Sequence, residues 1–156
     1  MKIAIGCDHA GFDLKKDILD LLHSLSVEHI DCGTDSAESV DYPDFGEKVS
    51  RHVSSGDAER GILICGTGLG MSMVANKFPK IRAALCSDML TAKMSRLHTD
   101  ANVLVLGARI IGKEMAKEIV KTWLNTPFEG DRHQRRISKI EALEEQLKTD
   151  ESQRSQ

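Results

Sequence analysis

Residues 61–71 have the sequence Gly61-Ile62-Leu63-Ile64-Cys65-Gly66-Thr67-Gly68-Leu69-Gly70-Met71. The apolar run that opens this segment is rich in β-branched residues, which predicts a buried strand. Its later glycines predict a tight turn whose backbone can approach a ligand closely, and the residues from Met71 to Lys77 predict a helix. A helix N-terminus after such a turn presents free N–H groups and the positive end of a dipole. These groups suit an anion or a developing oxyanion.

Cys65 lies at the lip of this turn, a position that favours the ionised form of a thiol. Two common phosphate-binding motifs do not fit the spacing. The dinucleotide motif G-x-G-x-x-G would need glycine where Met71 stands, and a P-loop would close with Gly-Lys-Ser or Gly-Lys-Thr. A cysteine phosphatase loop would need an arginine in the place of Met71. A purely structural turn beside a buried cysteine remains as an alternative.

The composition predicts one ordinary globular domain. The chain has 156 residues, of which 40% are apolar and 29% charged, and its formal net charge is -3. This charge argues against a nucleic-acid partner or a membrane surface, and no apolar run reaches transmembrane length. A strand that begins at Lys2 leaves no room for a signal peptide. The four cysteines form no C-x-x-C pair, which predicts a reduced, cytoplasmic protein without a zinc or disulfide framework.

Strands and helices alternate along the chain. We expect strands at 2–7, 27–32, 61–65, 81–86 and 102–106. We expect helices at 12–22, 45–53, 71–77, 90–97, 112–124 and 132–148, and a loop at 33–44. This order predicts the α/β class: a single three-layer α/β/α domain over residues 1–148, with a Rossmann-like parallel sheet of about five strands and a C-terminal helix. Residues 149–156 are expected to form a polar, flexible tail.

Ligands of such folds bind at the carboxyl ends of the strands. Asp8 and His9 follow the first predicted strand, Cys65 ends the third, Asp88 follows the fourth and Arg109 follows the fifth. We therefore expect these side chains near one edge of the sheet. The other cysteines also end strands, but no glycine turn follows them directly. We expect small buried side chains at Cys7, Cys32 and Cys86.

A basic segment follows at 130–136, with the sequence GDRHQRR. Arg132 and Arg136 are one helical turn apart, so they share a face, and two guanidinium groups on one face suit a phosphate dianion. A solvated helix start is the alternative. His98 ends a predicted helix, where a histidine is more often a favourable C-terminal charge than a catalyst.

A poised thiol, an oxyanion site and a phosphate site together favour proton abstraction next to a carbonyl. In these features the chain resembles the type B ribose-5-phosphate isomerases, a family that also contains allose- and galactose-6-phosphate isomerases. The segments that carry the resemblance are Gly6–Phe12, Asp41–Pro43, Gly61–Gly70, Ala75–Lys77, Asn102–Leu104, Gly107–Arg109, Gly130, Arg132–Gln134 and Arg136. They cover nearly the whole chain except the tail.

The resemblance implies a role for each candidate residue. Cys65 would be the base that moves a proton between C1 and C2, with Thr67 and His98 as further catalytic residues. His98 would assist ring opening as an acid, and the backbone N–H groups of residues 66–70 would stabilise the enediolate. The substrate-binding residues implied are Asp8, His9, Tyr42, Gly66, Thr67, Gly68, Leu69, Gly70, Thr99, Arg109, Arg132 and Arg136.

Within this set, Asp8 and His9 would bind the sugar hydroxyls, and the three arginines would hold the phosphate. The family often has asparagine directly after the ring-opening histidine, whereas this chain has Thr99, whose side chain is shorter. The resemblance implies neither a cofactor nor a metal.

The leading function is therefore the interconversion of ribose 5-phosphate and ribulose 5-phosphate. Three alternatives remain open at this point. One is a six-carbon isomerase that acts on allose 6-phosphate or galactose 6-phosphate. Another is a non-catalytic phosphate- or nucleotide-binding domain, which would need neither Cys65 nor His98. The last is a thiol-nucleophile hydrolase, which would need a base beside Cys65.

We also expect a homodimer, or a dimer of dimers, whose sites are shared between chains. Cys65 ends a strand at the carboxyl edge, whereas the helix that ends near His98 runs back to the amino edge. A strand spans ~17 Å, far beyond the ~3 Å reach of acid–base catalysis. His98 would therefore join the Cys65 site of a partner subunit. Apart from a small sugar phosphate we expect no further partner, neither nucleic acid nor membrane.

Overall fold

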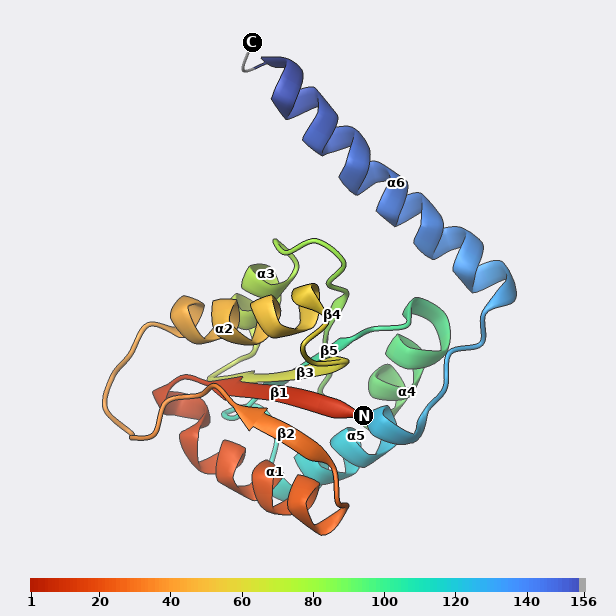
Figure 1. The fold of residues 1–156 in the computed structure, drawn as a ribbon. Coiled ribbons are helices and arrows are strands. Elements are labelled where there is room, and N and C mark those ends of the chain that lie inside the picture. The colour runs from red at the N-terminus through yellow and green to blue at the C-terminus, as the bar shows by residue number, and fades with distance from the viewer. Residues whose placement is uncertain (155–156) are drawn as a thin grey trace.

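The computed structural model describes residues 1–154, and a parallel sheet lies at its centre (Figure 1). The strand order is β2-β1-β3-β5-β4, and every pairing is parallel. The strands are β1 Lys2–Cys7, β2 Glu28–Asp31, β3 Arg60–Cys65, β4 Ala83–Leu85 and β5 Val103–Gly107. The predicted α/β fold is thus confirmed.

Helices cover both faces of the sheet. After a short 3-10 helix, η1 His9–Gly11, the helices are α1 Phe12–Ser24, α2 Tyr42–Ser55, α3 Leu69–Ala75, α4 Met89–Thr99, α5 Lys113–Asn125 and α6 Asp131–Arg154. Alternate strand residues face opposite sides: Ile3 and Ile5 pack with α1 and α5, whereas Ala4 packs with α2 and α3. This alternation produces the three layers that the sequence predicted.

The order in which the chain adds strands to the sheet reverses between β1 and β3. β1 pairs with β2 on one side and with β3 on the other. The connections after β1 and β3 therefore diverge, and the carboxyl ends of two such strands are the place where ligands of doubly wound folds bind. Asp8 and Cys65 stand at this point, because each lies at the end of one of the two strands.

Several element boundaries differ from the sequence prediction. Helix α3 spans Leu69–Ala75, two residues earlier at each end than predicted. The fourth strand contains only Ala83–Leu85. Helix α2 begins at Tyr42, inside the predicted loop, because Pro43 occupies the first turn, where its missing N–H breaks no bond. Helix α6 continues past Lys148 to Arg154. Of the predicted tail, residues 155–156 lie outside the part of the chain that the structure describes.

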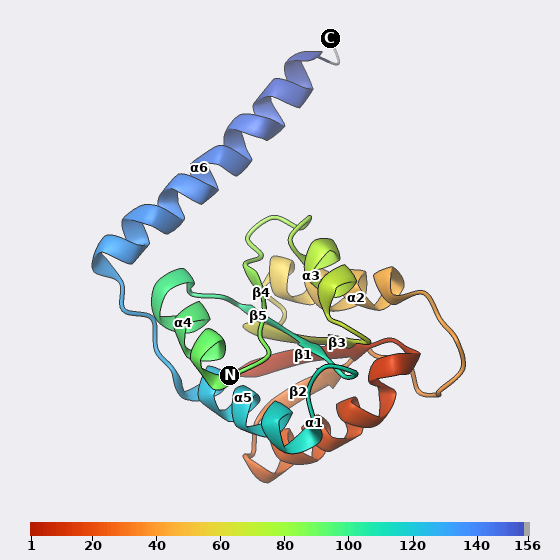
Figure 2. The same ribbon diagram turned by 180° about the vertical axis from the view of Figure 1, so that it is seen from behind.

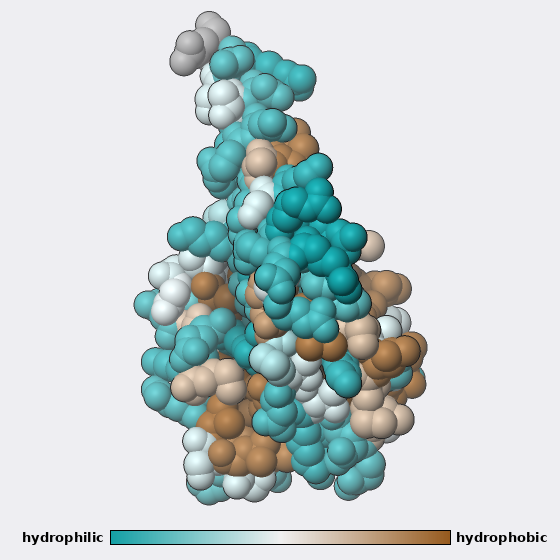
Figure 3. Space-filling view, turned by 90° about the vertical axis from the view of Figure 1, so that its right-hand side faces the viewer, coloured by the Kyte–Doolittle hydropathy of each residue, from teal (hydrophilic) through white to brown (hydrophobic). Residues whose placement is uncertain are grey.

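Helix α6 rises from the body beside α4 (Figures 1 and 2). Only His133 and Ile137 are buried on it, and its surface is mostly hydrophilic (Figure 3). Ile140, Leu143 and Leu147 are each more than half exposed, at 57%, 54% and 56%. Their spacing puts them on one face, so α6 carries an apolar stripe that this chain leaves largely uncovered. Within residues 1–154, no helix is long and apolar enough to cross a membrane.

Candidate active site

The turn after β3 holds the sulfur of Cys65 in a defined place. Cys65 is 5% exposed, and the backbone N–H of Gly68 donates a hydrogen bond to its Sγ at 3.2 Å. An N–H that donates to sulfur suits a sulfur that carries negative charge. The bond closes a tight loop because Gly68 has a φ of 81°, in the left-handed region that glycine adopts readily.

Tyr42 packs against the first turn of α3. A Cβ built on Gly70 would lie 2.5 Å from two ring carbons of Tyr42, so only glycine admits the ring at this distance. Tyr42 begins α2, a helix from the neighbouring crossover, and remains 39% exposed. A side chain predicted to bind substrate thus borders the glycine turn.

Two of the backbone N–H groups expected to stabilise an oxyanion already have partners. Gly68 donates to the Cys65 sulfur, and Leu69 donates to Oγ1 of Thr67 at 3.3 Å. Gly70 follows them in the first turn of α3, where N–H groups have no intrahelical acceptor. Thr67 is exposed, and its oxygen is the acceptor in this bond, so its hydroxyl proton can be donated elsewhere.

The residues after β1 lie beside this turn. The N–H of Asp8 donates to the carbonyl of Ile64 at 3.3 Å, which ties the end of β1 to the end of β3. Asp8 is 6% exposed, and its Oδ1 caps η1 by accepting the N–H groups of Ala10 and Gly11 at 3.0 and 3.1 Å. Nδ1 of the adjacent His9 lies 3.1 Å from the N–H of Val40, which donates to it.

Arg109 joins the same group from the loop after β5. Its N–H donates to the carbonyl of Gly66 at 2.9 Å. A Cβ on Gly66 would lie 3.4 Å from Arg109 Nη1, so the guanidinium lies over the turn of its own chain. The carboxyl-edge group therefore comprises Asp8, His9, Tyr42, Cys65 to Gly70, and Arg109.

The other predicted site residues lie at the opposite edge of the sheet. His98 is in the last turn of α4, which ends just before β5 begins at Val103. Its ring stacks on that of His133, with centroids 4.2 Å apart and planes 11° apart. Arg132 and Arg136 are exposed on the α6 turns that flank His133. We call His98, Arg132 and Arg136 the amino-edge group, and a single chain does not bring it to Cys65.

Sequence reasoning assigned no role to Glu129 or His133. His133 Nε2 lies 3.0 Å from Glu129 Oε2, which is an ion pair when the histidine is protonated. Nε2 is buried and makes no hydrogen bond within the described residues, so this pair is a close electrostatic contact. The sequence signal that could have identified this pair is a glutamate four residues before a histidine at the start of a helix.

These two residues and His98 are the one cluster of potential metal ligands among residues 1–154, with ligand atoms within 4.8 Å of one another. Chelation requires lone pairs that converge on one point. The two imidazole planes are nearly parallel, so lone pairs in those planes run side by side. The cluster is therefore arranged as a stacked pair rather than as a metal site.

Thr99 was expected to bind substrate, but its hydroxyl group already donates a hydrogen bond within α4. Its hydroxyl donates to the carbonyl of Ser95 at 2.6 Å, one turn back along α4. A threonine commonly forms this bond near a helix end, and it occupies the single donor of the side chain. In this conformation Thr99 can offer a ligand only the lone pairs of its oxygen.

The remaining cysteines are structural. Burial raises the pKa of the Cys7 thiol to about 11 and raises the pKa of Cys32 and Cys86 above the ordinary value of 9.0. Cys7 and Cys86 are almost fully buried, whereas Cys32 is half-buried. At neutral pH these three side chains stay neutral. The prediction of a small buried side chain is confirmed for Cys7 and Cys86 and was wrong for Cys32.

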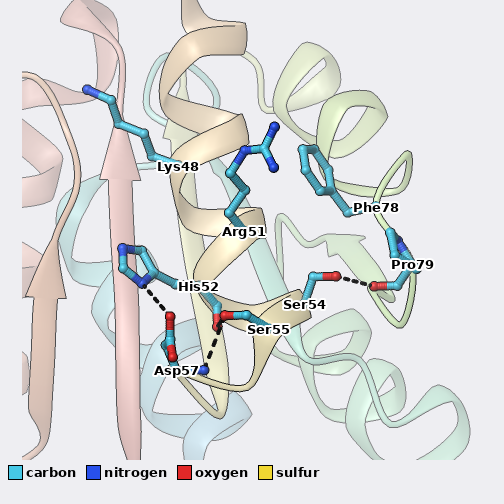
Figure 4. A pocket seen from close by; sticks show the side chains of 8 residues that line it. All are labelled: Lys48, Arg51, His52, Ser54, Ser55, Asp57, Phe78 and Pro79. Carbon is cyan, nitrogen blue, oxygen red and sulfur yellow. Dashed lines mark hydrogen bonds and ion pairs between the residues drawn. The ribbon is translucent and has the colours of Figure 1, made fainter.

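A groove of about 610 Å³ lies away from these residues, on the outer face of α2 (Figure 4). The side chains of Lys48, Arg51 and His52 line one wall, and Phe78 and Pro79 line the other. The Arg51 guanidinium lies 5.7 Å from the centre of the Phe78 ring. No residue of the carboxyl-edge or amino-edge group lines this groove, so its size is not a guide to the chemistry.

Comparison with known proteins agrees with the fold and the motifs. The model of the family described as Ribose/Galactose Isomerase matches residues 3–140. The chain is 51% identical to ribose-5-phosphate isomerase B of Escherichia coli, over 92% of this chain and 97% of that protein. The structure of ribose-5-phosphate isomerase B of Clostridium thermocellum matches with a TM-score of 0.93 and 54% identity, over 94% and 99% of the two chains. A further relative, the D-erythrulose-4-phosphate isomerase of Pectobacterium atrosepticum, is 43% identical over 95% and 98% of the two chains.

Proposed function

The chain belongs to the ribose/galactose isomerase family, and we propose that it is an aldose–ketose isomerase that interconverts ribose 5-phosphate and ribulose 5-phosphate. Similarity to two ribose-5-phosphate isomerases over more than nine-tenths of the chain supports this substrate. The observation that carries the chemistry is the Cys65 sulfur, held by the N–H of Gly68 in a turn between β3 and α3.

In the proposed mechanism, Cys65 is the base. As a thiolate, its Sγ removes the proton from C2 of the open-chain aldose, and the electron pair of the C–H bond moves toward the carbonyl to form an enediolate. The proton of the C2 hydroxyl passes to the C1 oxygen, and the thiol returns its own proton to C1, which yields the ketose. The N–H of Gly70 and the hydroxyl of Thr67 are the donors that stabilise the oxyanion, because the N–H groups of Gly68 and Leu69 have other acceptors.

Substrate recognition uses both charge and hydrogen bonds. Asp8 and His9 bind the sugar hydroxyls, and Tyr42 forms one wall beside Gly70. Arg109, Arg132 and Arg136 hold the phosphate through charge-assisted hydrogen bonds. His98 assists ring opening as an acid, and no cofactor or metal takes part in the proposed reaction.

A partner subunit completes the proposed site. Within one chain the amino-edge group is separated from Cys65 by the length of the sheet, about 17 Å for an average strand. A two-fold axis that brings the amino edge of one chain to the carboxyl edge of another resolves this separation. Large apolar side chains beside the carboxyl edge are exposed, which supports an interface there: Leu69 54%, Met73 67%, Met89 46%, Leu90 65% and Ile110 58%. A dimer, or a dimer of dimers, satisfies this arrangement.

Two other function classes are less well supported. A non-catalytic phosphate-binding domain has no need of the Cys65–Gly68 contact. A thiol-nucleophile hydrolase needs a general base next to its sulfur, and the hydrogen-bond partner of Cys65 Sγ is a backbone N–H rather than a histidine. Free cysteines suit a reducing compartment, so the proposal includes a cytoplasmic location.

Parallel isomerase assays test the substrate. The purified protein is assayed with ribose 5-phosphate, allose 6-phosphate, galactose 6-phosphate and D-erythrulose 4-phosphate, and kcat/KM is compared. We expect the highest value with ribose 5-phosphate. A higher value with a six-carbon or four-carbon sugar phosphate would move the proposal to that substrate, and no turnover of any of them would reject it.

A further inference from the structure

Lys15 is a buried cation that the proposed chemistry does not use. It lies on α1, and its side chain is 3% exposed. Its Nζ donates to both carboxylate oxygens of Asp31, at 2.9 and 2.8 Å, and to the carbonyl of Thr34 at 2.8 Å. An ammonium group has three donors, so each N–H of Lys15 has its acceptor.

The acceptors of Lys15 lie on both sides of the point where β2 leads into loop 33–41: Asp31 ends β2, and Thr34 lies at the start of the loop. Asp31 Oδ1 also accepts the N–H of Gly33 at 2.9 Å. The N–H of Thr34 donates to the carbonyl of Cys7 at 3.1 Å, at the end of β1. Lys15 and its acceptors thus anchor the start of the loop to the strand end that carries Asp8 and His9.

The end of the same loop contacts His9. The N–H of Val40 donates to His9 Nδ1 at 3.1 Å. A neutral imidazole has one nitrogen that donates and one that accepts. Because Nδ1 is the acceptor here, Nε2 carries the proton. His9 can therefore act as a hydrogen-bond donor through Nε2.

The middle of the loop contributes little to its own placement. The hydrogen bonds of residues 35–39 join them only to one another and to Thr34: Thr34 Oγ1 to the carbonyl of Ser36 at 3.5 Å, and the N–H of Glu38 to Ser36 Oγ at 3.3 Å. The position of Val40 therefore depends on the two ends of the loop. One end is held by Lys15, and the other leads into α2 at Tyr42.

We propose that Lys15 is a positioning residue of the isomerase site: by anchoring loop 33–41 it keeps the Val40 N–H on His9 and so holds His9 as an Nε2–H donor to the substrate. The inference rests on the proposed function, in which His9 binds the sugar phosphate. Its structural half, the tautomer of His9, does not depend on any activity.

The tautomer is measured directly on the unmodified protein. ¹⁵N–¹H correlation spectra of the imidazole distinguish a protonated ring nitrogen from an unprotonated one, and the His9→Asn variant assigns the signals. At a pH where His9 is neutral we expect the proton on Nε2. A proton on Nδ1 would overturn the inference even if the isomerase activity is present.

Kinetics of Lys15→Met test the role of the anchor. This substitution removes the ammonium but keeps an unbranched side chain of similar length. We expect a mixture of His9 tautomers and a KM for ribose 5-phosphate up to about 10-fold higher, the upper end for one hydrogen bond between neutral groups. We expect kcat to change less than about two-fold. Lys16→Met is the matched control, because Lys16 is exposed and its ammonium contacts Asp13 and the Phe12 ring rather than loop 33–41. It should leave both constants unchanged.

A double-substitution cycle separates positioning from general stability. If Lys15 acts through His9, adding Lys15→Met to His9→Asn should raise KM little further. Additive losses, or a wild-type KM in folded Lys15→Met, would reject the role of Lys15. Should Lys15→Met fail to fold, Asp31→Asn takes its place, since the Asp31 side chain is 40% exposed. For Asp31→Asn we expect a smaller increase in KM than for Lys15→Met. An unaltered His9 tautomer and an unaltered KM would reject the positioning role of Lys15. Wild-type protein that does not isomerise ribose 5-phosphate would refute the proposed function instead.

Discussion

The backbone N–H of Gly68 donates a hydrogen bond to the sulfur of Cys65 at 3.2 Å. The two residues are three positions apart, and the bond forms because Gly68 adopts a φ of 81°. A Cβ at Gly68 would lie 2.4 Å from Leu85 Cδ1, so the turn also packs closely against β4. The position of the proposed base therefore depends on the lack of a side chain at Gly68.

Gly68→Ala should reduce both stability and activity. Gly56 is a matched control, because it has a similar φ of 87° but no atom within 4 Å of a built Cβ. We expect Gly56→Ala to lower the free energy of unfolding by about 1 kcal/mol, the cost of the left-handed backbone alone. Gly68→Ala should cost a further ~1–3 kcal/mol from overpacking. Denaturant unfolding measures the free energy of unfolding of the two variants. If Gly56→Ala and Gly68→Ala lose the same amount of it, the packing argument is contradicted.

Cys65→Ser should nearly abolish turnover while the fold survives. A serine hydroxyl is too weak an acid to ionise at neutral pH, and loss of a general base lowers the rate by ~10²–10⁴-fold. Circular dichroism checks the fold, and Cys32→Ser is the control, because Cys32 is a half-buried cysteine outside the glycine turn. A kcat above about a tenth of the wild-type value would show that Cys65 is not the base. Chelators should have no effect on the wild-type enzyme.

Arg136→Ala should weaken phosphate binding. A charge-assisted contact contributes roughly 1.5–3 kcal/mol, so we expect kcat/KM to fall by ~10–150-fold. The loss should be much smaller for a substrate without phosphate. Arg135→Ala is the control, since Arg135 is an exposed neighbour on the same helix. Equal losses with and without the phosphate would assign Arg136 a structural role.

Mixed dimers test whether the site is shared. Cys65→Ser and His98→Asn proteins, each of which we expect to be inactive alone, are mixed after their subunits have been dissociated. Each mixed dimer should contain one site with both native residues, so part of the activity should return. If mass spectrometry confirms subunit exchange and no activity returns, the two residues do not act in one site across the interface.

The Cys7 thiol should make stability depend on alkaline pH. Burial raises its pKa from 9.0 to about 11. Between these values the unfolded chain loses the thiol proton while the folded chain keeps it, so stability falls as pH rises through this window. The loss for two pKa units is at most ~3 kcal/mol. The gap in unfolding free energy between wild type and Cys7→Ala should narrow from about pH 8 to pH 11, and a constant gap would refute this.

Local sequence signals accounted for much of the fold. Apolar patterns and the glycine turn at 66–70 identified the strands and showed that they alternate with helices. Such local patterns suffice because a strand or a turn depends mainly on residues that are neighbours in the sequence. The parallel arrangement then placed Asp8, Cys65 and Arg109 at one edge and His98 at the other. The shorter fourth strand and the earlier start of α2 at Tyr42 were missed, since element ends depend on packing and capping more than on periodicity.

The amino-acid sequence alone predicted a parallel sheet of about five strands, with Asp8, His9, Cys65 and Arg109 at its carboxyl edge and His98 at its amino edge. Only the tertiary structure determined which donors and acceptors pair: Val40 with His9, Lys15 with Thr34, and the ring of His98 with that of His133. These partners come from different elements, and their contacts depend on rotamers and loop paths chosen by packing. Periodicity along a chain carries no information about those choices, because a hydrogen bond between distant residues is specified only when the folded chain brings both groups within about 3 Å.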